Sequence, residues 1–168
     1  MRMMLLATVS LILAGGVDLG ARKCDQAPPS AAVRAKCPFN FEITVADADK
    51  SAAWYESTLG LVRRKSVSFP KGKFIILGSP SIEVEIIQHE ASVDTRKDLK
   101  ISEDYLQRGI FKIGFYVDDL DATVARLKER QVHFYMEKGR DAELHLRFAL
   151  ITDLDGNTIQ LFENEAKG

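Results

Sequence analysis

Hydrophobic and polar residues alternate with a period of two from Phe39 to Val45, which predicts a strand with one apolar and one polar face. Apolar residues at helical spacing follow, and Gly60 ends that pattern. The same order returns 72 positions later, with an alternating run from Phe111 to Val117 and a helical pattern from Leu120 to Arg130. The chain therefore carries two copies of one strand–helix unit.

Three more strand patterns follow each helix, separated by turn residues. They run over Leu61 to Phe69, Phe74 to Leu77 and Ile82 to Ile87 in the first copy, and over His133 to Met136, Leu144 to Leu150 and Thr158 to Phe162 in the second. Asp155-Gly156 is a strong hairpin signal. The pattern predicts an α+β fold of two tandem βαβββ units, residues 39–88 and 110–163, in one domain over 39–165. We expect the helices to cover one face of a cup-shaped mixed sheet.

The polar stretch from 89 to 109 has no sustained period, so we interpret it as the crossover between the two copies. One helical turn is expected near Glu103 to Leu106. A loop of this length in a compact domain is often functional, which makes a lid an open alternative.

The first 21 residues resemble a secretory signal peptide, because Arg2 precedes an apolar stretch from Met3 to Ala14 and small residues follow. The stretch is short for a membrane span. Residues 22–38 are then an N-terminal arm rich in Pro, Ala and Ser. This interpretation predicts a periplasmic or secreted protein. A disordered or over-extended start would instead make it cytoplasmic.

Cys24 and Cys37 lie in this arm, and an oxidising compartment would allow them to pair. Closing a loop of that size is worth about 3 kcal/mol in the chain-entropy model. Neither cysteine belongs to a Cys-X-X-Cys motif or to a zinc-like spacing, so we expect them to fasten the arm.

Composition narrows the range of partners. The chain has 168 residues, 46% of them hydrophobic, and a formal net charge of −1 with mixed signs. That is enough apolar material for one core, and it predicts no general affinity for nucleic acids or for membranes after signal removal.

Several motifs together resemble the vicinal oxygen chelate superfamily. They are the Val-X-Asp phrases at Val45 and Val117 that open both helices, Trp54-Tyr55 before Leu59-Gly60-Leu61, and the closing Asp153-Leu154-Asp155-Gly156-Asn157-Thr158-Ile159-Gln160-Leu161. This superfamily includes glyoxalase I, extradiol dioxygenases, methylmalonyl-CoA epimerase, and bleomycin and fosfomycin resistance proteins. The resemblance covers about residues 38 to 165. It implies the fold, whereas one fold hosts many activities.

The metal enzymes of this superfamily hold a divalent ion with four His or Glu side chains in the cup. The register of the resemblance assigns these positions to Asn40, Glu85, Lys112 and Gln160, of which only Glu85 agrees. Amide carbonyls are weak ligands for a transition ion, and an ammonium group repels one. We therefore expect no metal and no other cofactor, with Lys112 paired to Glu85 in place of a cation.

An alternative metal site is conceivable, because Glu42, Glu85 and His145 could all face the cup by alternation. His89 and His133 lie at strand ends. For each histidine alone, a surface or hydrogen-bonded structural role is the better interpretation.

The leading functional hypothesis is metal-independent binding of a small polar or anionic molecule. Tyr116 would stack on a ring, and Lys112 and Arg147 would hold an anionic group. The full set of expected ligand-binding residues is Asn40, Glu42, Glu85, Lys112, Tyr116, Arg147 and Gln160.

Two other classes stay open. In a glyoxalase-like lyase or isomerase, Glu85 or Lys112 would be the catalytic candidate that moves a proton, with or without a metal. In an exported interaction module there would be no ligand, and the resemblance implies a possible homodimer. The substrate and the oligomeric state are not given by the sequence.

Overall fold

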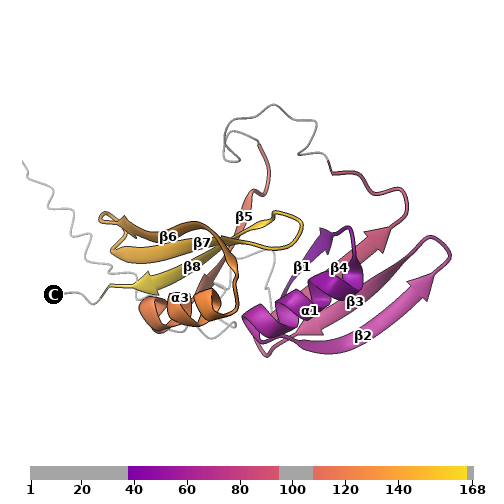
Figure 1. The fold of residues 1–168 in the computed structure, drawn as a ribbon, viewed down its shortest axis with the longest axis horizontal. Helices are drawn as coiled ribbons and strands as arrows, with labels where there is room; N and C mark the ends of the chain where they lie inside the picture. The colour runs from indigo at the N-terminus through magenta and orange to yellow at the C-terminus, as the bar shows by residue number, and fades with distance from the viewer. Residues whose placement is uncertain (1–37, 95–107, 166–168) are drawn as a thin grey trace, which may run out of the picture.

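The computed structural model describes residues 38–94 and 108–165. The first unit consists of β1 (Phe39–Thr44), α1 (Ala48–Leu59), β2 (Val62–Phe69), β3 (Gly72–Gly78) and β4 (Ile82–His89). The second consists of β5 (Lys112–Tyr116), α3 (Leu120–Glu129), β6 (His133–Asp141), β7 (Leu146–Thr152) and β8 (Thr158–Asn164). Figure 1 shows the two units side by side. The expected signal peptide, both cysteines and the expected helical turn lie outside the described residues.

Each unit forms one four-stranded mixed sheet, in the orders β1-β4-β3-β2 and β5-β8-β7-β6. In each sheet the first strand runs parallel to the last, and the other neighbours are antiparallel. The prediction of an α+β fold with two βαβββ units is confirmed. Within the described ranges, no strand of one sheet pairs with a strand of the other.

Each of the two helices in residues 38–94 and 108–165 begins at the aspartate of its Val-X-Asp phrase. The Asp47 carboxylate accepts a hydrogen bond from the Lys50 amide at 3.1 Å, and Asp119 accepts one from the Ala122 amide at 2.8 Å. The α1 helix ends at Gly60 in the left-handed conformation, with φ of 68°. After α3 the left-handed position belongs to Gln131, with φ of 58°, so a non-glycine residue makes this turn.

The strand ends in the second unit differ from the prediction. The β6 strand continues to Asp141, and β7 begins at Leu146 because the preceding residues form a turn. Leu144 lies in that turn with 63% of its surface exposed, and His145 adopts a φ of 52°. A left-handed residue breaks strand pairing, which alternation alone does not reveal.

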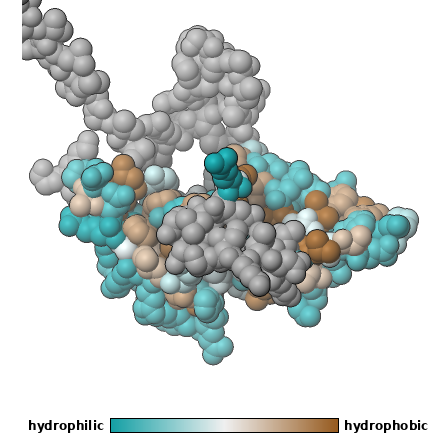
Figure 2. All heavy atoms as spheres, turned by 90° about the horizontal axis from the view of Figure 1, so that it is seen from above, coloured by the Kyte–Doolittle hydropathy of each residue, from teal (hydrophilic) through white to brown (hydrophobic). Residues whose placement is uncertain are grey.

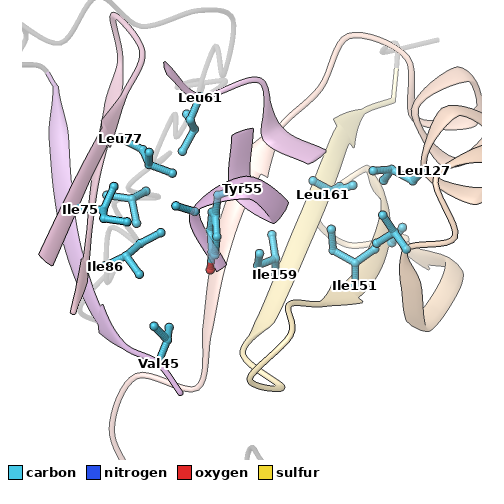
Figure 3. Packing of buried hydrophobic residues seen from close by; sticks show 14 of the residues in the cluster. Val45, Tyr55, Leu61, Ile75, Leu77, Ile86, Leu127, Ile151, Ile159 and Leu161 are labelled. Atoms are coloured by element: carbon cyan, nitrogen blue, oxygen red, sulfur yellow. The ribbon is translucent and has the colours of Figure 1, made fainter. Parts of the chain in front are cut away.

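A single hydrophobic cluster joins the two units. Figure 3 shows Tyr55 of α1 between Ile75, Leu77 and Ile86 of the first sheet and Ile159 of β8. Tyr55 and Ile159 have no exposed surface. Because the cluster draws on both halves, each sheet buries its helix-covered side in a shared core.

The surface mixes hydrophobic and hydrophilic residues, as Figure 2 shows in brown and teal for one face. None of the helices in the described residues is long and apolar enough to cross a membrane.

Candidate functional site

Each sheet has a distal face, defined here as the face turned away from its own helix. On β1, Phe41 and Ile43 pack toward the core, so Asn40 and Glu42 belong to the distal face. Asn40 lies opposite Glu83 on β4 and donates a 3.0 Å hydrogen bond to its carboxylate. Glu42 lies opposite Glu85. The first distal face is thus acidic along its edge.

Farther from β1, the first distal face becomes apolar. Phe74 and Ile76 of β3 lie opposite Ile87 and Glu85, respectively. On β2, Val67 lies opposite Phe74. This face therefore combines carboxylates with apolar side chains.

The second distal face carries an aromatic stack. The rings of Tyr116 and Phe162 lie 5.3 Å apart and nearly parallel. Gly114 makes room for this stack, because a Cβ there would lie 2.5 Å from Cε2 of Phe162. Tyr116 itself is 56% exposed. A flat ring in solution can reach this stack.

Gln160 lies in the centre of the same face, opposite Gly114 on β5 and Leu150 on β7. Only 4% of its surface is exposed. Its Oε1 atom is buried and, within the structure described, accepts no hydrogen bond. An unsatisfied buried acceptor of this kind costs about 1–3 kcal/mol, so a hydrogen bond from an ordered water or from a ligand donor that reaches it would be favourable.

Lys112 lies at the start of β5 on this distal face, opposite Thr158 on the neighbouring strand β8. Its ammonium group sits 5.0 Å from the ring centre of Phe111. No ion pair joins Lys112 to Glu85 in the described structure, so the expected pairing of these residues is not observed. Lys112 is exposed and free to meet an anion.

The prediction that Arg147 belongs to this group is wrong. Arg147 lies opposite Glu163 on the helix-covered side of the sheet, where it donates to Glu163 at 3.2 Å and to Asp121 of α3 at 2.5 Å. Both faces of β7 carry apolar residues, so alternation could not identify the buried face. Ala149 and Ile151, which have no exposed surface, decide it.

The Arg147 contacts are structural. The Glu163 carboxylate also accepts a 3.0 Å hydrogen bond from the Leu120 amide at the start of α3. Arg147, followed by Lys138, holds the pKa of Asp121 below its usual value by hydrogen bonding. This cluster therefore fastens α3 to its sheet.

The residues at the superfamily's metal position do not fit a metal. Asn40 is bonded to Glu83, and Lys112 brings a positive charge to the same set. In residues 38–94 and 108–165, no three His, Cys, Asp or Glu side chains are arranged to hold an ion. The alternative set is not assembled either, because His145 lies in the turn before β7, beside Glu165.

The other two histidines make hydrogen bonds near strand ends. The Nδ1 atom of His133 lies 2.8 Å from the Thr152 hydroxyl. His89 accepts a 3.1 Å bond from the Ala91 amide through its Nδ1. Both contacts match the expected structural role.

A set of hydrogen bonds between the two units escaped the sequence analysis. The Asp153 carboxylate accepts a bond from the Tyr55 hydroxyl at 2.9 Å. Asp155 accepts bonds from the Ser51 hydroxyl at 3.0 Å and from the Ala46 amide at 2.8 Å. We call these three contacts the clasp. In the sequence the closing aspartates signal only a hairpin, and nothing in their spacing points to a helix about 100 residues earlier.

Residues 39–161 match the family model of the Glyoxalase/Bleomycin resistance protein/Dioxygenase superfamily. The chain belongs to this superfamily. It is 28% identical over 127 residues to the uncharacterized protein YurT of Bacillus subtilis (strain 168), covering 72% of this chain and 94% of YurT.

Solved structures support the same fold. A glyoxylase/bleomycin resistance protein/dioxygenase domain from Frankia sp. EAN1pec aligns with a TM-score of 0.60 and 17% identity, covering 75% of this chain and 95% of the domain. A glyoxalase family protein from Enterococcus faecalis aligns with a TM-score of 0.60 and 19% identity, covering 75% and 94%. At these identities the likeness shows the architecture of the superfamily member and leaves its activity open.

Proposed function

We propose that this superfamily member binds a small, ring-containing anion on its distal faces without a metal. The observation that carries the proposal is the buried, unpartnered Oε1 of Gln160. A ligand N–H or O–H group would satisfy this acceptor. The ligand is therefore expected to carry a donor as well as a ring.

The neighbours of Gln160 supply the other two requirements. The Tyr116–Phe162 stack offers an exposed aromatic surface to a flat ring. Lys112 offers a positive charge at the same face. An anionic aromatic molecule with one donor would use all three features.

The first distal face would form the opposite wall of the site. Asn40, Glu42 and Glu85 lie there, and their carboxylates would attract donor groups and repel a second negative charge. The two faces would enclose a ligand either within one chain or between two copies, and the second arrangement requires a homodimer. Light scattering of the purified protein, with and without ligand, distinguishes one copy from two.

A matched trio of compounds tests the binding site. Calorimetric titration compares 3-amino-2-naphthoate, which has ring, anion and donor, with 2-naphthoate and 2-naphthylamine, which lack the donor and the anion, respectively. We expect 3-amino-2-naphthoate to bind most tightly. Equal affinity for all three would contradict the assigned roles.

Two variants assign the roles residue by residue. Lys112→Ala should remove the preference for the anionic compounds, and Gln160→Leu should remove the preference for the amino group. Lys71→Ala is the matched control, because Lys71 lies in the turn between β2 and β3 beside Glu90. Unchanged affinities in both site variants would place the ligand elsewhere.

We also propose that the protein is exported, because residues 1–21 resemble a signal peptide and Cys24 and Cys37 follow. Mass spectrometry of the protein recovered from each compartment of an expressing cell tests this. A mature chain that lacks the first residues supports export. A mass lower by two further hydrogens supports a disulfide between the cysteines. A full-length reduced chain in the cytoplasm contradicts it.

A further inference from the structure

A pocket lies between the two units, and Tyr116 of the second distal face is among the residues that line it. Its volume is about 320 Å³, within the range of small-molecule sites. The hydrophobic lining includes Leu59, Leu61 and Ile82 from the first unit and Phe115, Leu127 and Leu161 from the second. Phe115 and Leu161 belong to the helix-covered side of their sheet, so most of the lining from β5 and β8 comes from the side opposite to the distal face.

The charge of the pocket is one-sided. Arg126 and Arg130 line it, whereas no aspartate or glutamate is among its described lining residues. The two arginines lie four positions apart near the end of α3, a spacing at which like charges repel. The helix C-terminus favours cations in general. That preference does not explain why both line the same hollow.

Arg126 is held in place by one hydrogen bond to its own helix. Its guanidinium donates a 2.9 Å hydrogen bond to the Thr123 hydroxyl, which in turn donates to the Asp119 carbonyl at 2.7 Å. A guanidinium has five N–H donors, so most of them stay available. The Arg130 side chain makes no hydrogen bond or ion pair within the described structure.

The internal repeat explains why a hollow exists here. The offset of 72 positions that relates Val45 to Val117 also relates Tyr55 to Leu127 and Ser51 to Thr123. Tyr55 and Ser51 are the helix residues of the clasp. Their counterparts in α3 both line the pocket.

The turns of the two units correspond by their place in the fold, because Ser79 directly follows β3 and Asp153 directly follows β7, at an offset of 74 positions (153 − 79). The Ser79 hydroxyl accepts a bond from the Ile82 amide at 3.3 Å, as the Asp153 carboxylate accepts one from the Asn157 amide at 2.7 Å. Ser79 lines the pocket. The pocket is therefore the repeat-related counterpart of the clasp, with leucine in place of the tyrosine and serine in place of the aspartate.

We propose that this pocket binds a small arylalkyl carboxylate. Its ring would occupy the space in the pocket that is equivalent to the space filled by the Tyr55 ring at the clasp. Its carboxylate would supply a negative charge equivalent to that of Asp153. Arg126 and Arg130 hold that carboxylate by charge-assisted hydrogen bonds. In Figure 3 Leu61 lies on one side of this region and Leu127 and Leu161 on the other, whereas the Tyr55 hydroxyl points toward the end where Val45 lies.

The test uses the full chain and three probes of equal length, 4-phenylbutyrate, 4-phenylbutanol and 4-phenylbutylamine. Calorimetric titration should give the carboxylate at least tenfold tighter binding than the alcohol, because a hydrogen bond to a charged group is worth that much. The amine should bind more weakly still. Equal affinity of the three probes would overturn the proposal.

Variants separate this pocket from the distal-face site. Arg126→Gln combined with Arg130→Gln should weaken 4-phenylbutyrate binding about tenfold or more. Both arginines are exposed, so folding should be preserved. Lys128→Gln is the matched control on the same helix, because Lys128 pairs with Glu137 outside the pocket. Loss of 4-phenylbutyrate binding in Lys112→Ala, with the double arginine variant unaffected, would place this ligand on the distal face and overturn the assignment.

A third variant fills the pocket by introducing, at the equivalent positions, the residue types found at the clasp. Leu127→Tyr with Ser79→Asp should abolish 4-phenylbutyrate binding and leave naphthoate binding unchanged. Should this variant fail to fold by circular dichroism, Ser81→Trp at an exposed lining position takes its place. Full retention of 4-phenylbutyrate affinity in the folded blocking variant would overturn the proposal.

Discussion

The Tyr55 hydroxyl donates a 2.9 Å hydrogen bond to the Asp153 carboxylate across 98 positions of sequence. Asp153 is only 7% exposed, and it also accepts bonds from the Asp155 and Asn157 amides and from the Asn157 side chain. This carboxylate therefore organises its own turn and fastens that turn to α1.

Replacing Tyr55 with phenylalanine should lower the free energy of unfolding by about 1–3 kcal/mol, because it removes one partner of a buried charge. Urea denaturation measures the change. Tyr116→Phe is the control, since Tyr116 is 56% exposed, and it should change stability by less than about 0.5 kcal/mol. Equal effects of the two substitutions would show that the clasp contributes nothing specific.

The same tyrosine should make stability fall at high pH. Burial, followed by the nearby Asp153 charge, raises the pKa of Tyr55 above its usual value of 10.0. As pH rises, Tyr55 therefore loses its hydroxyl proton in the unfolded chain before it does so in the folded protein. The contribution of Tyr55 to stability then declines above about pH 10. The wild type should lose up to about 1.4 kcal/mol per pH unit relative to Tyr55→Phe. Parallel pH profiles of the two proteins would rule this out.

Replacing Gln160 with leucine should raise stability by about 1 kcal/mol, since it removes a buried acceptor without a partner. Thermal denaturation measures this. The same substitution should weaken binding of 3-amino-2-naphthoate. A variant that is less stable than the wild type would indicate that the amide makes a contact essential for folding.

Gly114→Ala should destabilise the second sheet by about 1–3 kcal/mol, because its methyl group would collide with the Phe162 ring. A Cβ at this position lies 2.5 Å from Cε2 of that ring. Adding Phe162→Leu should restore part of the loss, and a double-mutant cycle measures the coupling. Additive effects would mean that the ring moves aside freely.

Arg147→Ala should raise the pKa of Asp121 toward its usual value, since Arg147 is the largest cause of the lowering. A carboxyl group whose pKa is lowered by folding adds stability at pH values above its pKa in the unfolded chain. This stability is lost as pH falls through its pKa in the folded protein. The difference between wild type and variant should therefore shrink below about pH 4 and in high salt. NMR titration of Asp121 measures the shift, and ligand binding should not change.

The sequence predicted the elements well where local signals agree. Asp47, Asp119 and Gly60 mark helix ends by capping chemistry that acts within a few residues. The alternation of β1 and β5 separates the core face from the distal face because only one side is apolar. Asn40, Glu42, Lys112, Tyr116 and Gln160 accordingly lie on the distal faces.

The sequence failed where the deciding contact is distant in the chain. Arg147 lies on a strand with apolar residues on both faces, and only its neighbours Asp121 and Glu163 show which face is covered. The predicted pairing of Lys112 with Glu85 rests on complementary charge alone, whereas the two residues belong to different sheets whose relative placement no local pattern records. The clasp and the pocket both depend on how the units pack, which no local pattern records.

The clasp also has a consequence for how the two units would move relative to each other. Its three hydrogen bonds join the units at one end of their shared core. Among the described residues that line the pocket at the other end, no hydrogen bond crosses between units. We expect a small rotation of one unit against the other to pivot at the clasp. The displacement between the units would then be largest at the pocket. A molecule seated between Arg126 and Leu61 would then restrict the rotation of one half of the protein against the other.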